Sequence, residues 1–210
     1  MLFIGICGPS GSGKTTLSEE LVRAAGVSST LIKQDAYYYD FPDCSFDERA
    51  RMNYDEPGIF DHDLLLGDVS QLLAGRPVTR KSYDFSNYAR NDSDELIIPG
   101  EVLIVEGIHA FFDDRLCERM FLKLYINVEP DICLLLRINR DIKERERSID
   151  SITRQYLTTV KPMYDAHIRN YIHKADVIVT RGGKNARIVE ILAGYLRDAL
   201  EQKIAQDDAR

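Results

Sequence analysis

The sequence predicts an α/β fold in which a parallel five-stranded sheet carries helices on both faces. Apolar runs of strand length recur along the 210 residues, and segments with helical spacing lie between them. Apolar runs separated by helical segments are typical of a parallel sheet that is covered on both faces. The length suits a single domain over residues 1–210. The predicted strands are residues 2–7, 30–32, 102–105, 121–126 and 177–179.

The first predicted strand leads directly into a glycine-rich loop that indicates the class of ligand. The loop matches Gly-x-x-x-x-Gly-Lys-Ser/Thr at every position, with Gly8, Pro9, Ser10, Gly11, Ser12, Gly13, Lys14 and Thr15. In this pattern backbone N–H groups surround a polyphosphate, the lysine reaches the β and γ phosphates, and the hydroxyl holds Mg²⁺. A helix predicted from Thr16 to Ala25 directs its positive end at the same anion. We therefore expect residues 8–16 to bind ATP or GTP with Mg²⁺; the alternative is a glycine-rich turn without a ligand.

Two acidic residues end predicted strands, at the edge of the sheet where α/β proteins bind ligands. Asp35 follows the second strand and Glu106 the third, so both should lie near Thr15 and the γ phosphate. Asp35 leads into the long segment that follows, and we expect it to remove the proton of an acceptor hydroxyl. Glu106 belongs to the central sheet, and we expect it to bind Mg²⁺ through water. The alternative for each is a structural cap on the next element.

About seventy residues separate the second strand from the third, more than a crossover requires. This insertion, residues 36–99, should therefore carry structure and function of its own. It is expected to contain a short helix after a capping box at 45–48, a core-facing helix over 61–75, and a hairpin of 77–85 with 95–98 whose polar tip is 91–94.

A basic cluster follows the fourth strand, on a segment that Asp131 and several apolar residues mark as helical. Positions 137, 140, 144 and 147 share one helix face. Phosphoryl transfer requires guanidinium groups on a mobile element that expels water, so we predict a lid over residues 137–160. The alternative is a solvated surface, with Asp141 paired with Arg145 and Glu144 paired with Ser148 or Arg147. The cluster consists of Arg137, Arg140, Lys143, Arg145, Arg147 and Arg154.

The composition excludes several classes of partner. A net charge of −7 argues against broad binding to nucleic acid, whose phosphates require clustered cations. The four cysteines show neither a C-x-x-C pair nor zinc spacing, which favours reduced thiols inside the cell. No apolar stretch approaches the roughly 18 residues of a membrane span, and no signal peptide precedes the first strand. We therefore predict a cytoplasmic protein with neither nucleic acid nor membrane as a partner.

Taken together, the motifs resemble those of the uridine kinase (uridine–cytidine kinase) family in order and spacing over nearly the whole chain. The resemblance implies a P-loop kinase-type sheet with an inserted helical and hairpin region that binds a nucleoside. It further implies transfer of the ATP or GTP γ-phosphate to the 5′-hydroxyl of a pyrimidine ribonucleoside, in pyrimidine salvage, by a homotetramer. The motifs are the phosphate loop and residues 32–38, 53–57, 83–85, 106–108, 137–145 and 175–183.

The resemblance also implies roles for individual residues. Asp35 resembles the base on the 5′-hydroxyl, and Lys14, Arg140 and Arg145 complete the catalytic set. Arg140, Arg145 and Arg147 resemble phosphate-binding residues of a lid. Packing is the alternative role for the aromatic residues, including Tyr37. The implied nucleoside contacts are Asp35, Tyr38, Tyr54, Asp55, Tyr83, Phe85, Tyr88, Arg137 and Gln155, with Asp55 and Arg137 on the ribose and Tyr83 on the base.

Four positions depart from the usual pattern of the family, among them Glu56 in place of His and Lys174 in place of Tyr. Tyr88 stands where many members carry His, at a position expected to touch the 4-substituent of the pyrimidine. A phenol held by a neighbour offers only its oxygen, which suits the amino group of cytosine, so we hypothesise a preference for cytidine. Glu146 stands where glycine is usual, beside Arg145 and Arg147, and would weaken or stiffen the lid.

Other functions share parts of this pattern. The same architecture serves kinases of other metabolite hydroxyls, phosphoribulokinase-like or nicotinamide riboside kinase-like, although the aromatic-rich insertion favours a flat base to stack on. A nucleotide-dependent binding module that reads guanine would need an Asn-Lys-x-Asp segment, which the chain lacks. Residues 181–185 lie where an adenine-side loop is expected, but they do not discriminate ATP from GTP. A subunit contact is expected on an apolar face of the hairpin or of the helix with Ile188, Val189, Ile191 and Leu192.

Overall fold

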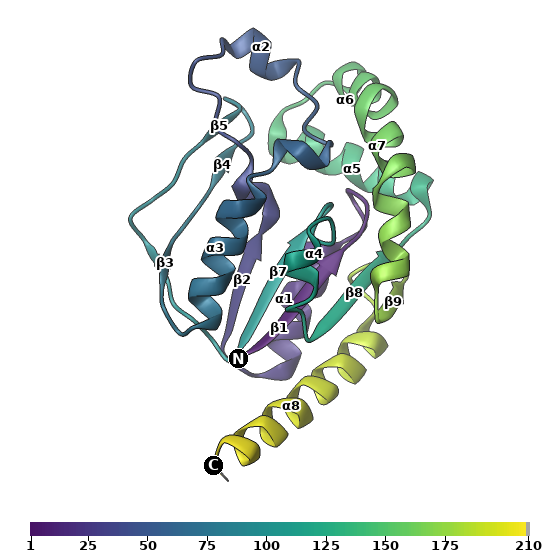
Figure 1. The fold of residues 1–210 in the computed structure, drawn as a ribbon. Coiled ribbons are helices and arrows are strands. Elements are labelled where there is room, and N and C mark those ends of the chain that lie inside the picture. Colours follow the sequence, from purple (N-terminus) through teal and green to yellow (C-terminus); the bar gives the residue numbers. More distant parts are fainter. Residues whose placement is uncertain (209–210) are drawn as a thin grey trace.

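The computed structural model describes residues 1–208, and its centre is a parallel five-stranded sheet in the order β2-β7-β1-β8-β9 (Figure 1). Each predicted apolar run forms one of these strands, so the predicted α/β fold is confirmed. The strands are β1 (Leu2–Cys7), β2 (Ser29–Lys33), β7 (Val102–Gly107), β8 (Leu122–Asn127) and β9 (Val177–Thr180).

Helices cover both faces of the sheet, and β1 is therefore buried along its whole length. Its side chains alternate between two cores. Ile4 and Ile6 face one core, and Phe3 and Cys7 face the other. The first core includes residues of α1 (Lys14–Ala25) and α8 (Ala186–Asp208), and the second includes residues of α3 (His62–Leu73) and η4 (Ile168–Lys174).

The strand register brings the carboxyl ends of the central strands to one edge. Glu106 of β7 lies opposite Ile6 of β1 and opposite Lys33 of β2. The glycine-rich loop begins just past Cys7, and Asp35 lies just past Lys33. The loop and both predicted carboxylates therefore emerge at the same edge of the sheet.

The segment between β2 and β7 contains both predicted helices. Ser45 and Glu48 form the predicted capping box. The side chain of Asp61 accepts a hydrogen bond from the backbone N–H of Leu64 at 2.9 Å and so caps α3. In Figure 1, α2 stands above the carboxyl edge of the sheet. The elements are η1 (Gln34–Tyr37), α2 (Phe46–Ala50), η2 (Pro57–Ile59) and α3.

The hairpin turns at a different place from the one predicted. The chain reverses at residues 85–88, so residues 91–94 lie in the returning arm and not at the tip. The Asp84 carboxylate accepts hydrogen bonds from the N–H groups of Ser86 (2.8 Å) and Asn87 (3.2 Å), a side-chain turn that outweighs the polar run. Two short ladders form sheets of their own, β3 (Val78–Thr79) with β6 (Leu96–Ile97) and β4 (Tyr83–Asp84) with β5 (Ala89–Arg90).

The basic helix α5 (Pro130–Arg145) is shorter than predicted. It ends at Glu146, whose φ of +52° reverses the chain, and Ser148 then caps α6 (Ile149–Gln155). Arg147 therefore lies beyond the helix and not on the face of position 140. Its backbone N–H donates to the Asp141 carbonyl at 3.1 Å, which folds it back onto α5. The remaining elements are α4 (Asp114–Cys117), η3 (Tyr156–Val160) and α7 (Lys161–Ala166).

The apolar residues of helix α8 that were predicted to form a subunit contact are mostly buried within the protein. Val189 and Leu192 are buried in the core, whereas Ile191 is 59% exposed. Most of that face therefore packs within the protein, while Leu96 and Ile98 of the hairpin region are exposed. Neither α8 nor any other helix in residues 1–208 combines the length and the apolar character needed to cross a membrane.

Candidate active site

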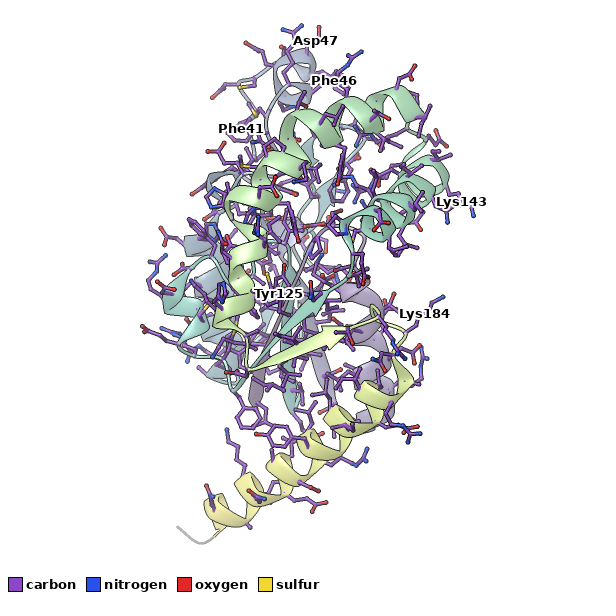
Figure 2. The ribbon with its side chains drawn as sticks, turned by 90° about the vertical axis from the view of Figure 1, so that its right-hand side faces the viewer. Phe41, Phe46, Asp47, Tyr125, Lys143 and Lys184 are labelled. Carbon is purple, nitrogen blue, oxygen red and sulfur yellow. The ribbon has the colours of Figure 1, made fainter. Side chains whose placement is uncertain are left out.

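The glycine-rich loop packs closely against two other segments. Gly11 and Gly13 have φ of +85° and +90°, which side-chain-bearing residues rarely adopt. A Cβ on Gly11 would lie 2.3 Å from the carbonyl oxygen of Cys133 in α5. A Cβ on Gly13 would lie 2.8 Å from the backbone N of Gly183. The loop therefore sits between the start of α5 and the 181–185 segment that was expected beside the nucleotide; Figure 2 shows Lys184 of that segment at the surface.

Lys14 folds back across this loop. Its side-chain Nζ donates to the carbonyl oxygens of Gly8 and Pro9, each at 3.1 Å. Because α1 begins at Lys14, the N–H groups of its first turn also lie beside the loop. An ammonium group and free N–H groups thus occur together, as anion binding requires.

Thr15 and Glu106 meet as the sequence predicts. The Thr15 hydroxyl donates to the Glu106 carboxylate at 2.6 Å. Burial raises the pKa of Glu106, while the positive charge of Lys14 and the Thr15 hydrogen bond oppose that rise. A hydroxyl and a buried carboxylate beside a phosphate loop are oxygen ligands of the kind that Mg²⁺ prefers.

Asp35 is half-buried in η1, and its environment differs from that of a capping residue. Within residues 1–208, η1 has no side-chain cap, and no hydrogen bond or ion pair engages the Asp35 carboxylate. The carboxylate interacts electrostatically with Glu106 and Arg145. Asp35 therefore does not make the hydrogen bond that the alternative role, a structural cap, would require.

One cavity of about 370 Å³ gathers the predicted residues of the insertion and of the basic segment. Its size is within the usual range of small-molecule sites. Of the phosphate loop, Ser10 reaches its wall. The other predicted residues that line it are Asp35, Tyr38, Tyr54, Asp55, Tyr83, Phe85, Tyr88, Arg137, Arg140, Arg145, Arg147 and Gln155.

Aromatic rings form one wall of this cavity. Tyr38 packs at 4.9 Å from Tyr83, and Tyr88 stacks on Tyr54 at 5.4 Å. The buried hydroxyls of Tyr54 and Tyr83 interact with each other, and burial together with this interaction raises the pKa of Tyr83. The rings therefore offer aromatic surface on which a flat ligand can stack. Tyr37 instead lies in the core and donates to Asp68 at 3.0 Å, as its packing alternative predicts.

A cluster of polar and charged side chains also lines the cavity. Asp55 is 5% exposed, and the Thr159 hydroxyl donates to its carboxylate at 2.8 Å. Arg137 lies 3.8 Å from Asp55, and its Nη2 donates to the side-chain oxygen of Gln155 at 2.9 Å. Burial raises the pKa of Asp55, whereas Arg137 and Thr159 counteract that rise. This set presents hydrogen-bonding groups suited to vicinal hydroxyls.

Two residues at this site hold positive φ angles. Tyr88 has φ +51° and Glu146 has φ +52°. Such a conformation costs an L-residue roughly 1–3 kcal/mol and often marks a functional site. At Glu146 it explains why glycine would suit this position, since glycine commonly ends helices in this conformation. Tyr88 is held in addition by the ring of Phe46, 5.6 Å away.

Sequence reasoning missed several residues. Phe46 and Ser86 line the cavity, but their motifs indicated only a helix cap and a hairpin. Asp141 was interpreted as one half of a surface pair, yet it is fully buried among arginines. Glu144, expected to pair with Ser148, is exposed and makes no such contact in the described structure. No local signal marked Asp141, because residues 137–145 are mostly charged.

His109 was also missed, and it supports Asp55 from behind. His109 is 1% exposed; its Nε2 lies 2.7 Å from the Asp55 backbone oxygen, and its Nδ1 lies 2.8 Å from the Tyr171 hydroxyl. The backbone oxygen only accepts, so Nε2 carries the proton and Nδ1 accepts from Tyr171. The neutral imidazole thus holds the Asp55 segment against η4.

Acid should destabilise the fold through His109. Burial, together with the nearby His167 and His62, lowers the pKa of His109 from 6.5 to about 4, although the hydrogen bond to the Asp55 backbone opposes this shift. The unfolded chain therefore binds a proton that the folded chain excludes, so stability is complete above the unfolded pKa and falls as the pH drops towards 4. The loss is about 3 kcal/mol. Urea unfolding at pH 7.5 and pH 4.5 should show a smaller decrease for His109→Gln than for the unchanged protein.

The matched control for this measurement is His173→Gln, because His173 is exposed. It should retain the full decrease with pH. An equal decrease in His109→Gln would show that His109 is not the group responsible.

Known proteins match nearly the whole chain. Residues 3–187 match the phosphoribulokinase/uridine kinase family. The chain is 40% identical to the uridine kinase of Limosilactobacillus reuteri over 201 aligned residues. The alignment covers 95% of this chain and 92% of that protein. It is 41% identical over 198 residues to the uridine kinase of Lactiplantibacillus plantarum, covering 94% and 95%. The structure of phosphoribulokinase from Rhodobacter spheroides has a TM-score of 0.63 at 16% identity, covers 85% of this chain and 69% of that chain, and shows a common fold.

Proposed function

Because the chain belongs to the phosphoribulokinase/uridine kinase family, we propose that it transfers the γ-phosphate of ATP to the 5′-hydroxyl of a pyrimidine ribonucleoside. The names of its relatives support this reaction, since uridine kinases match it over more than nine tenths of their length. The fold alone does not discriminate, because a phosphoribulokinase has it as well.

The observation that carries the proposal is the composition of the cavity of about 370 Å³ beside the phosphate loop. The cavity offers aromatic rings, among them Tyr38, Tyr83 and Tyr88, which suit a flat base. It also offers Asp55, Arg137 and Gln155, which suit ribose hydroxyls. Asp35 lies on the wall between loop and insertion with a free carboxylate. A sugar phosphate without a base would leave the aromatic wall without a partner.

In the proposed reaction Asp35 accepts the proton of the 5′-hydroxyl while that oxygen bonds to the γ phosphorus. The bond from this phosphorus to the β–γ bridging oxygen breaks, and ADP leaves. Lys14 and the arginines balance the negative charge that develops on the transferred group. Closure of the 137–160 lid over the cavity would exclude water and so limit hydrolysis.

Thr15 and Glu106 are the residues that would hold a magnesium ion, directly and through water. Their direct contact at 2.6 Å and the burial of Glu106 fit an oxygen-ligand site beside the phosphates. Bound there, the ion would supply positive charge to the β- and γ-phosphate oxygens.

The reaction is tested by initial rates with a panel of acceptors. We expect Mg-ATP to phosphorylate uridine and cytidine, to leave ribulose 5-phosphate unchanged, and to release little phosphate without an acceptor. Transfer to ribulose 5-phosphate alone would contradict the proposal and support the phosphoribulokinase-like alternative. Phosphate release that is independent of any acceptor would support a nucleotide-dependent module instead.

A preference for cytidine is the finer part of the proposal. Tyr88 stacks on Tyr54 and contacts Phe46, which restricts the position of its phenol oxygen, and this oxygen can accept a hydrogen bond from the cytosine amino group. We expect kcat/KM to favour cytidine over uridine by roughly tenfold, the effect of one hydrogen bond in a closed site. Tyr88→His should bring the two values together. Comparable values for both nucleosides in the unchanged protein would contradict the preference.

We further propose GTP as a second donor, a role in pyrimidine salvage in the cytoplasm, and a homotetrameric assembly. The exposed Leu96 and Ile98 of the hairpin region support a subunit contact there. Initial rates with GTP as the donor test the second-donor proposal. Sedimentation of the purified protein tests the homotetramer.

A further inference from the structure

Asp141 is a fully buried carboxylate surrounded by four guanidinium groups. Its side chain is 0% exposed, and it does not line the cavity. Arg140 donates to its Oδ1 from Nε at 2.9 Å and from Nη2 at 2.7 Å. Arg137, Arg145 and Arg147 lie within 3.5–3.9 Å of its two oxygens. All four arginines line the cavity, so Asp141 can affect a ligand only through them.

The two oxygens of Asp141 divide the arginines into two pairs. Oδ1 faces Arg140 and Arg145, at 2.7 Å and 3.9 Å, and Arg145 interacts electrostatically with Asp35. Oδ2 faces Arg137 and Arg147, at 3.6 Å and 3.5 Å. One pair therefore lies towards the carboxylate proposed to act on the 5′-hydroxyl.

The second pair contacts Gln155 and Asp55, which also line the cavity. Arg137 and Arg147 both donate to the side-chain oxygen of Gln155, at 2.9 Å and 2.5 Å. Arg137 also lies 3.8 Å from Asp55. A ligand that contacts Asp55 and Gln155 must therefore displace or tighten the groups that face Oδ2.

Charge explains why one carboxylate stands at this centre. Four guanidinium groups in one cluster repel one another. Burial and the charge of Arg140 lower the pKa of Arg145, whereas the Asp141 carboxylate raises it. Except for Arg140, the pairs are 3.5 Å or longer, beyond good hydrogen-bond geometry. Buried Arg137 Nε has no hydrogen-bond partner within residues 1–208. The cluster thus has contacts that can still tighten when a ligand binds.

We propose that Asp141 is a positioning residue that couples nucleoside binding to phosphate binding. The inference rests on the proposed function, because it takes Asp55, Arg137 and Gln155 as the nucleoside end and Arg140 and Arg145 as the phosphate end. A nucleoside that orders the Oδ2 pair fixes the Asp141 carboxylate, and the carboxylate then holds the Oδ1 pair in the direction of the transferred phosphoryl group. By linkage, the nucleotide must strengthen nucleoside binding by the same factor.

Calorimetry measures this coupling directly. The dissociation constant of cytidine is determined alone and with a saturating, non-hydrolysable ATP analogue and Mg²⁺, and uridine is measured in parallel. We expect the analogue to tighten nucleoside binding by about 5–150-fold in the unchanged protein. Asp141→Asn should reduce this ratio to nearly one, because the neutral amide cannot hold both pairs. A merely structural role would lower thermal stability and leave the ratio unchanged.

Two further variants keep the test decisive. Glu144→Gln removes an exposed carboxylate from the same helix, and it should retain the ratio of the unchanged protein. Asp141→Asn removes the negative charge at the centre of the cluster, so its folding is checked by thermal melting. Asp141→Glu keeps the charge that compensates the arginines but moves the carboxylate, and it should also lose the coupling. A folded Asp141→Glu or Asp141→Asn with an unchanged ratio overturns the inference.

The binary affinities separate this inference from the proposed function. If the unchanged protein binds both ligands with a ratio near one, the coupling role of Asp141 is wrong while the kinase assignment stands. If it binds neither uridine nor cytidine, the proposed function fails and the inference fails with it.

Discussion

Asp35→Asn is expected to lower the rate of phosphoryl transfer by roughly 10²–10⁴-fold, the range for loss of a positioned base. Asparagine has nearly the same shape but cannot accept the proton of the 5′-hydroxyl. The Asp35 carboxylate has no hydrogen bond to lose within residues 1–208, so the substitution should leave the fold and the nucleotide affinity unchanged. Single-turnover rates with cytidine and uridine, together with the dissociation constant of ATP, measure the two effects separately.

Asp43→Asn is the matched control, because Asp43 is an exposed carboxylate in the same insertion and does not line the cavity. It should transfer phosphate at the unchanged rate. Transfer that survives within a few-fold in Asp35→Asn would make Asp35 a structural residue and remove the proposed mechanism.

Lys14→Ala is expected to impair both nucleotide binding and turnover, with a decrease in kcat of roughly 10²–10³-fold, typical of losing one group that stabilises developing charge. The Lys14 ammonium lies across the phosphate loop on the carbonyl oxygens of Gly8 and Pro9, where a triphosphate would run. Steady-state rates over a range of ATP concentrations give kcat and KM. An unchanged rate would contradict the assignment of residues 8–16 as the phosphate loop.

Lys143→Ala controls for the general loss of a positive charge. Lys143 is exposed on α5 and points away from the molecule in Figure 2. Its removal should change neither kcat nor KM for ATP by more than a small factor, since exposed charges contribute little across solvent.

Local patterns were sufficient for the elements whose signals lie within a few residues. The apolar runs of β1 and β7, the capping box at Ser45 and the phosphate loop all form as predicted, because each depends on neighbours in the chain. The hairpin tip was misplaced because a side-chain turn at Asp84 competed with a longer polar run. The extent of the basic helix was wrong because a glutamate occupies a helix-ending conformation that glycine usually signals.

The sequence by itself determined the α/β class, the phosphate loop and the two carboxylates that end strands, because periodicity and motif spacing encode them locally. Only the tertiary structure decided that Asp141 is a buried centre for four arginines and that His109 supports the backbone of Asp55. It also decided that Arg147 folds back from beyond the helix. These contacts join residues through chain reversals and packing, and whether a charged side chain is solvated or enclosed depends on elements that its own neighbours do not specify.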